Sequence, residues 1–303
     1  MKKIVAITAM GLMLLTAACT KTDIDIYVHN GDNTSGSMNG SAGIDGIDTL
    51  FFYPRVETEK SRSIEPFPKG CSVTIYSFNV NGEDVGKWNY RSNTVGSIDP
   101  VGADATVPTG DYEFYGVSVK SSTTPPTFVD NNTSDIKNGI DYLWCKSGLQ
   151  QVKYNKTTVP LIFKHAGVQI IIYFTMATSK DSIISVGDAL MDAPQTGSNS
   201  WNLLTGNITA STSMLKSNIK MVPMGNYGLY QFIVPLQYNG SLLIYFSLKT
   251  VGNAGYTNYK IELPVYHKYF QGGYSYVYTV QIKDNNANLG DVNVYPWKEI
   301  EME

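Results

Sequence analysis

A two-residue alternation of side-chain character, which runs along most of the chain after Gly70, constrains the fold more than any other feature. The stretch from Tyr112 to Val119 shows it, and turn-forming pairs such as Asn81-Gly82 and Asn239-Gly240 separate the alternating runs. No segment sustains a helical period, and only short helical turns are expected near Asp181 to Met191. The pattern therefore predicts an all-β fold.

One long apolar run predicts where the chain divides. It extends from Val159 to Phe174, and fully extended it would span roughly 50 Å, which is too long for one strand of an ordinary sheet. A break at Ala166-Gly167 resolves this difficulty. We therefore predict two tandem β-sandwich domains, an N-terminal one over residues 47–166 and a C-terminal one over residues 167–303.

The first residues have the pattern of an export signal. Lys2-Lys3 precede an uncharged stretch from Ile4 to Leu15, and small residues end at Cys19. This stretch is shorter than the roughly 20 residues that a helix needs to cross the hydrocarbon core, so residues 1–18 are predicted to be a signal peptide that is removed. The segment before Cys19 resembles a bacterial lipobox, although its leucine stands four and not three positions before the cysteine. The resemblance implies that Cys19 is acylated with chains such as palmitate and anchors the protein to the outer membrane.

The next stretch, residues 19–46, predicts a flexible tether. It is rich in Asp, Asn, Ser and Gly, and such a composition cannot bury a core. Without residues 1–18 the chain has 21 basic and 26 acidic side chains, a net charge of −5, and it shows no basic patch. We therefore expect no nucleic acid partner.

Two cysteines remain for the folded part, Cys71 and Cys145. Both lie in apolar sequence contexts, and an exported protein meets conditions that permit disulfides. The sequence leaves open whether they pair or stay as two separate buried thiols.

Residue types that carry catalysis or bind metals are sparse and scattered. The histidines, His29, His165 and His267, have no second His or Cys at metal-ligand spacing. The carboxylates form no acid–base pair, and a nucleophile elbow, a phosphate loop and a calcium loop are missing from the sequence. We predict a structural role for each histidine, no catalytic residue, no metal site, no cofactor and no enzymatic activity.

A group of aromatic residues near the C-terminus allows another function. Alternation along a strand favours core packing for them, but an exposed sheet of such rings would suit stacking against sugars. The alternative function is therefore a surface glycan-binding lipoprotein of a nutrient-uptake system. The residues are Tyr266, Tyr269, Phe270, Tyr274, Tyr276 and Tyr278.

Two segments at opposite ends of the folded chain suggest a mechanism. Residues 47–56 predict an alternating apolar strand, and the polar, basic stretch from Glu57 to Ser63 suits cleavage by a trypsin-like protease. The stretch from Asp291 to Glu303 also alternates, and Pro296, which cannot donate a ladder hydrogen bond, belongs at a sheet edge. The simpler interpretation is a first strand with a surface loop and a last strand with a frayed end.

Seven short motifs occur in order along nearly the whole chain. They are the lipobox at Cys19, Asp141-Tyr142-Leu143-Trp144-Cys145, the strand from Leu161 to Ala166, Trp201 followed by Gly206, Phe232-Ile233-Val234-Pro235-Leu236, Phe270-Gln271-Gly272-Gly273-Tyr274, and Val294-Tyr295-Pro296-Trp297. In this order and spacing they resemble the fimbrillin-like family of fimbrial subunits and cell-surface adhesin lipoproteins of the Bacteroidales.

The resemblance implies two transthyretin-like, Greek-key β-sandwich domains and a pilus subunit or surface adhesin that assembles by strand exchange. In that mechanism a protease cuts after a basic residue, the first strand leaves, and a terminal strand of another subunit fills the groove. Carried over to this chain, the cut would follow Arg62 or, as second choice, Arg55. The displaced strand would contain Ile47, Leu50, Phe51, Phe52 and Tyr53, and the donor strand Val292, Val294, Ile300 and Met302.

The resemblance also implies partners and a location. The partners would be other fimbrial subunits in a homopolymer or heteropolymer, the outer membrane through the lipid, and a ligand on a host or bacterial surface. The expected location is the outer membrane and the cell surface, in a fimbrium. Stalk, tip and anchor subunits share this pattern, so the position within a fibre stays open.

Overall fold

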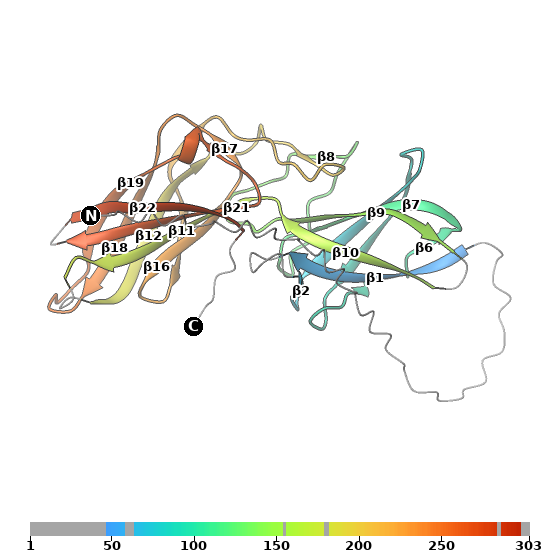
Figure 1. The fold of residues 1–303 in the computed structure, drawn as a ribbon, viewed down its shortest axis with the longest axis horizontal. Helices are drawn as coiled ribbons and strands as arrows, with labels where there is room; N and C mark the ends of the chain where they lie inside the picture. The colour runs from blue at the N-terminus through green and yellow to red at the C-terminus, as the bar shows by residue number, and fades with distance from the viewer. Residues whose placement is uncertain (1–46, 58–63, 154–155, 179–181, 284–285, 298–303) are drawn as a thin grey trace, which may run out of the picture. The chain divides into compact units, whose positions relative to one another are not determined.

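The computed structural model describes residues 47–57, 64–153, 156–178, 182–283 and 286–297. The regular structure of these residues is strand, apart from one short 3-10 helix, η1 (Tyr266–Lys268). The predicted all-β fold is confirmed. The helical turns expected near Asp181 to Met191 are wrong for the described residues, because β12 (Ile183–Pro194) is a strand that paired neighbours on both sides hold extended (Figure 1).

Nine strands from the first half of the described chain form one sheet. They are β1 (Ile47–Glu57), β2 (Ile64–Pro66), β3 (Ser72–Asn79), β4 (Asp84–Arg91), β5 (Asp99–Pro100), β6 (Thr106–Pro108), β7 (Gly110–Ser118), β9 (Leu143–Val152) and β10 (Thr157–His165). Their order is β2-β1-β10-β9-β7-β3-β4-β5, with β6 paired to β1. β1 runs parallel to β10, so the first strand joins the sheet through a partner about 100 residues further along the chain.

This sheet folds over on itself around a first core. β10 pairs with β9 through only two residue pairs, and β1 and β10 therefore lie against β7 and β9 as a second layer (Figure 1). Phe52 of β1 packs edge-on against Tyr90 of β4 and Phe114 of β7, with ring centroids 5.3 and 5.5 Å apart. The inward side chains of the two layers thus share one sandwich core, to which β1 contributes directly.

Strand pairing changes partners after Ala166 and Gly167. The strands that follow are β11 (Val168–Met176), β12, β14 (Met214–Lys220), β15 (Val222–Met224), β16 (Gly228–Ile233), β18 (Ser241–Thr250), β19 (Thr257–Pro264), β21 (Tyr274–Lys283) and β22 (Asn286–Pro296). They form a five-stranded sheet in the order β15-β16-β11-β21-β22 and a four-stranded sheet in the order β14-β12-β18-β19. A second core contains inward side chains of both sheets, such as Ile170 and Ile172 of β11 and Ile244 and Phe246 of β18.

A third group of buried side chains, which we call the junction cluster, combines residues from both halves. It consists of Tyr76, Phe78, Tyr115, Val117, Val119, Phe128, Ile136, Tyr142, Ala166, Trp201, Leu203, Ile208 and Val234. Trp201 is fully buried and packs edge-on against Phe128 and Tyr142, with centroids 5.2 and 5.1 Å apart. Two small sheets lie outside the main ones, β8 (Asn132–Thr133) with β13 (Trp201–Asn202) and β17 (Leu236–Gln237) with β20 (Tyr269–Phe270). Since the chain from residue 43 onward forms one compact unit, the division at Ala166-Gly167 into two domains stays a prediction.

The two cysteines of the folded part are separate thiols. Cys71 and Cys145 are both buried and neither forms a disulfide. Burial raises the pKa of both thiols. Of the two possibilities that the sequence left open, the structure has the pair of buried thiols.

Candidate functional site

The first candidate element, β1, presents two different faces. Leu50, Phe52 and Val56 point into the first core, and each is at most 7% exposed. Phe51 is 47% exposed, and Ile47 and Tyr53 on the same outward face are similarly open. Of the five residues predicted to represent the displaced strand, Leu50 and Phe52 therefore plug the core, whereas the other three do not.

A buried carboxylate fixes the start of β1. Asp48 accepts hydrogen bonds from the backbone N–H groups of Lys156 and Thr157, at 2.6 and 2.9 Å, and from the Thr157 hydroxyl at 2.6 Å. Burial alone would raise the pKa of Asp48, but these donors outweigh it and lower the pKa below its ordinary value of 3.8. This role was not predicted from the sequence, although Asp48 lies on the same inward face as Leu50 and Phe52, where an acid needs a partner.

The second-choice cleavage site lies within the sheet. Arg55 pairs with Ile162 of β10 on one side and with Pro66 of β2 on the other. Its guanidinium lies 4.6 Å from the centre of the Tyr53 ring and hydrogen-bonds the Tyr53 hydroxyl. Arg62, the first choice, stands between β1 and β2 in the sequence and lies outside the described residues, as do Cys19, Ile300 and Met302.

The second candidate element, β22, is the last strand of the five-stranded sheet. It pairs along its length with β21, from Tyr274 opposite Pro296 to Lys283 opposite Asn286. Val292 and Val294 are partly buried and pack against the second core. The predicted donor residues that the structure describes are thus already engaged in their own subunit.

Trp297 is buried directly after β22 and holds its end. The indole stacks on the His165 imidazole, with centroids 3.9 Å apart and planes within 7°, and on the Phe232 ring at 5.5 Å. Its backbone N–H donates to the carbonyl of Gly273 at 3.0 Å. The near-terminal motif of the sequence therefore has a structural use, because its tryptophan ties β22 to β10 and β16.

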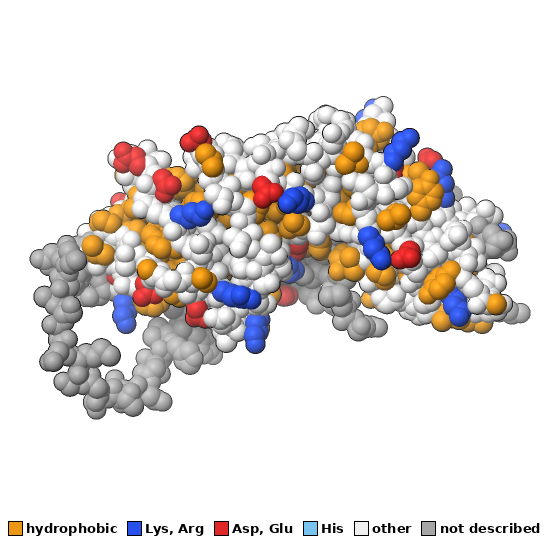
Figure 2. All heavy atoms as spheres, turned by 180° about the vertical axis from the view of Figure 1, so that it is seen from behind, with side chains coloured by type: hydrophobic (Ala, Val, Ile, Leu, Met, Phe, Trp, Pro, Cys, Tyr) orange, Lys and Arg blue, Asp and Glu red, His pale blue; other side chains and the backbone are white. Residues whose placement is uncertain are grey.

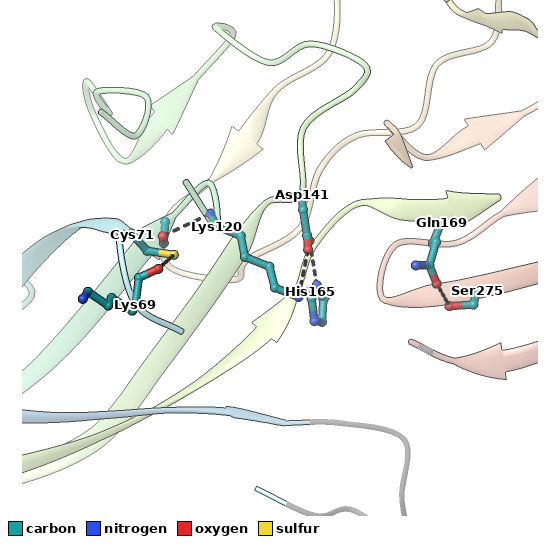
Figure 3. A network of polar contacts seen from close by, with 8 residues as sticks. Lys69, Cys71, Lys120, Asp141, His165, Gln169 and Ser275 are labelled. Atoms are coloured by element: carbon teal, nitrogen blue, oxygen red, sulfur yellow. Dashed lines mark hydrogen bonds and ion pairs between the residues drawn. The ribbon is translucent and has the colours of Figure 1, made fainter. Parts of the chain in front are cut away.

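A buried charged group lies beneath this tryptophan. Figure 3 shows Lys120 and His165 converging on Asp141, at 3.6 Å for the Lys120 Nζ–Asp141 Oδ2 pair and 2.6 Å for His165 Nδ1 and Asp141 Oδ1. Nearby, Ser275 donates to the amide oxygen of Gln169. Lys120, Asp141 and Gln169 line a cavity of about 670 Å³ with Tyr230, Phe232 and Trp297. His165 is the platform on which Trp297 stacks.

The glycine pair of the Phe270–Tyr274 motif permits a close backbone approach. A β-carbon on Gly272 would lie 2.3 Å from the carbonyl oxygen of Ala166, and Gly273 has a φ of +81°. The Gly273 N–H donates to the Gly167 carbonyl at 2.7 Å. Glycine at these positions therefore lets the turn before β21 contact the chain between β10 and β11.

The aromatic group that suggested a sugar platform is divided by the structure. Phe270, Tyr276 and Tyr278 are buried in the second core, and Tyr274 is partly buried against it. Tyr266 and Tyr269 remain exposed, at 40% and 42%. An exposed sheet of six rings is therefore not present.

Other chemistry is limited in the described part of the chain. No group of three or more His, Cys, Asp and Glu side chains there is placed to hold a metal ion. Nor does a helix among these residues have the length and apolar character needed to cross a membrane. On the face drawn in Figure 2, Lys and Arg side chains are interspersed with Asp and Glu. Strand pairing and core packing thus account for most of the features described, and they define an all-β protein.

Comparison with known proteins gives the family. The model of the fimbrillin-like family matches residues 55–297. The chain is similar in structure to candidate cell adhesion proteins of Bacteroides uniformis (17% identity, TM-score 0.58) and Bacteroides ovatus (13% identity, TM-score 0.61), covering 84% of this chain and 100% of theirs in both cases. A third, from Bacteroides fragilis, has 15% identity and a TM-score of 0.50 over 83% of this chain and 99% of that one. No curated protein matches the sequence.

The chain belongs to the fimbrillin-like family, because the family model covers most of its length. The predicted resemblance is thereby confirmed. The structural neighbours, at these low identities, support the fold. As a member of this family the protein is a fimbrial subunit or adhesin of the cell surface, with a structural and not an enzymatic role.

Proposed function

We propose that this chain is exported as a lipoprotein through Cys19, reaches the outer membrane, and polymerises with other fimbrial subunits by protease-triggered strand exchange. Cleavage after Arg62 would separate β1 from β2 and the rest of the domain. The observation that carries the proposal is the position of β1, a single strand whose inward side chains plug the first core. A donor strand from another subunit would occupy the vacated groove by β-augmentation.

The energetics favour exchange over simple loss of the strand. Returning Leu50, Phe52 and Val56 to water costs about 1.5–3 kcal/mol for each side chain, or about 5–9 kcal/mol together. The hydrogen bonds to Asp48 and the pairing with β10 add to this cost. A cut chain would therefore keep β1 in place until another strand supplies equivalent contacts.

The structure supports Arg62 over Arg55 as the cleavage site. A protease binds its substrate as an extended segment free of other pairing, whereas Arg55 is paired on both sides. The only other arginine of the chain, Arg91, lies in β4 and pairs with Ser72. An arginine-specific protease should therefore cut the folded protein once, after Arg62.

Donation by the C-terminal segment requires a rearrangement in the donor. β22 would have to separate from β21, and Trp297 would leave the ring contacts with His165 and Phe232. The proposal thus includes a spectroscopic consequence, a change in the fluorescence of Trp297 when subunits join. The other tryptophans, Trp88, Trp144 and Trp201, lie outside β22 and would report little of this step.

The test uses residues 20–303, which lack the signal and the lipidated cysteine. An arginine-specific protease is added, the new N-terminus is mapped, and size is followed by light scattering. We expect cleavage before Ser63 and concentration-dependent oligomers. Arg62→Ala should prevent both, whereas Arg91→Ala, an exposed arginine on β4, should behave as the parent protein.

A further, double variant tests the donor segment. Replacing both Ile300 and Met302 by Asp should suppress oligomers without preventing the cut. If the cut parent protein stays monomeric over the whole concentration range, strand exchange is wrong for this chain. If oligomers form equally well from the Ile300 and Met302 double variant, the donor lies elsewhere.

A further inference from the structure

A groove between the two halves of the chain has the chemistry of a sugar-binding site. It has a volume of about 630 Å³, and its lining includes Trp144, Lys164, Thr205, Asn207, Tyr269 and Gln271. We propose that this groove binds a neutral oligosaccharide. The proposal is independent of strand exchange, because the groove is present in the uncut subunit.

One part of the groove lining is a short segment that pairing with β17 and a tyrosine hydroxyl hold in place. The Tyr276 hydroxyl accepts a hydrogen bond from the Gln271 N–H at 2.8 Å and donates to the Tyr269 carbonyl at 3.3 Å. Between these two residues, Phe270 is fully buried in the second core. The alternation therefore turns the side chains of Tyr269 and Gln271 outward on a fixed backbone.

Another part of the lining is a tight turn that packs between two tryptophans. The Asn202 side-chain oxygen accepts from the Thr205 N–H at 3.0 Å and from its hydroxyl at 3.1 Å. A β-carbon on Gly206 would come within 2.5 Å of the Trp144 ring, and the Gly206 carbonyl accepts from the Trp201 indole at 3.0 Å. The turn is thus closely packed, and it presents the exposed side chains of Thr205 and Asn207.

The polar groups of these two parts of the lining are available to a ligand. Among the described residues, neither the Asn207 nor the Gln271 side-chain amide forms a hydrogen bond within the protein. Each amide offers both a donor and an acceptor, which matches the paired hydroxyls of a sugar ring. Tyr269, at 42% exposure, adds an aromatic surface for the apolar side of such a ring.

The charges at the groove favour a neutral ligand. The Lys164 ammonium lies 3.2 Å from the Glu57 carboxylate, and His165 is paired with Asp141. No other charged residue lines the groove within the described part of the chain. An acidic sugar would therefore find no unpaired cation, whereas amides and an aromatic ring need no charge on the ligand.

The test uses uncut residues 20–303 and a panel of lactose, N-acetyllactosamine, maltotriose and mannotriose. Saturation-transfer NMR reports which protons of the sugar contact the protein, and titration gives the affinity. We expect at least one sugar to bind with a Kd of about 1 mM or tighter. Tyr269→Ala should weaken it about tenfold, Tyr269→Phe should retain most of the affinity, and Asn207→Ala with Gln271→Ala should abolish it.

Tyr266→Ala is the matched control. Tyr266 is exposed to nearly the same extent as Tyr269, three residues away, but does not line the groove. Its removal should leave binding unchanged. The proposal is overturned if no sugar of the panel gives saturation transfer, or if Tyr266→Ala weakens binding as much as Tyr269→Ala. A subunit that binds sugar yet fails to oligomerise after cleavage would support this inference and contradict strand exchange.

Discussion

Replacing Phe52 by Ala measures how much β1 stabilises the first core. The ring is buried and meets Tyr90 and Phe114 edge-on at 5.3 and 5.5 Å, so its loss removes both transfer energy and two aromatic contacts. Phe→Ala at such a site costs about 3–5 kcal/mol, since the surrounding side chains fill the space only partly. We expect a loss of this size in the free energy of unfolding, measured by urea denaturation of residues 20–303.

The neighbouring residue on the same strand supplies the control. Phe51 is 47% exposed on the outward face, and Phe51→Ala should change the free energy of unfolding by less than about 1 kcal/mol. Because the two residues differ in which face of β1 they occupy, the contrast measures the stability that the inward face supplies. Equal effects of the two substitutions would refute the reasoning. Phe52→Ala should also release β1 more readily after cleavage, so that cut subunits exchange strands sooner than the parent protein.

Three further predictions concern the contacts around these elements. Asp48→Asn should lower stability at neutral pH by about 1.5–3 kcal/mol, since the donors of Lys156 and Thr157 lose a charged acceptor. The pKa of Asp48 in the folded protein lies below 3.8, its ordinary value. Its contribution to the free energy of unfolding is therefore present above pH 3.8 and lost as the pH falls through the folded pKa. Urea denaturation curves of parent and variant should converge at that low pH. Gly272→Ala should lower the free energy of unfolding by about 1–3 kcal/mol, because the new β-carbon would meet the Ala166 carbonyl. Gly255→Ala, with open space around it, should leave the same quantity nearly unchanged. Cys145, buried with a raised pKa, should react with a thiol reagent only after unfolding, and fast reaction of the native protein would contradict its burial.

Alternation along the chain predicts much of the fold, because a strand with one buried face has apolar residues at every second position. The run from Val159 to Phe174 is divided near Ala166-Gly167 as expected, since β10 ends at His165 and β11 begins at Val168. The parallel pairing of β1 with β10 was not predictable, because it joins residues about 100 positions apart. Local periodicity carries no information about such a partner.

The candidate site shows the same division between local and distant information. Leu50 and Phe52 could be identified from their positions in an alternating strand, but the role of Asp48 depends on donors at Lys156 and Thr157. Likewise, Trp297 was part of a recognised motif, yet its contact with His165 joins segments that the sequence separates widely. Contacts of this kind arise from the packing of the halves and leave no periodic signal.

The proposed strand exchange would also fix the register that a donor must follow. On its inward face β1 has Leu50, Phe52 and Pro54 at every second position. β22 repeats this order of two apolar residues and a proline at Val292, Val294 and Pro296. Because a one-residue slip would turn every inward side chain outward, this match would place Val294 at the Phe52 position in the cut neighbour. Ile300 and Met302 would then lie beyond the groove that β1 vacates, so this register applies if their double Asp variant still forms oligomers. Val294→Asp should then block oligomers, while Asn293→Asp, exposed on the other face, should permit them, provided both monomers stay folded by circular dichroism. Equal assembly of the two variants would exclude this register.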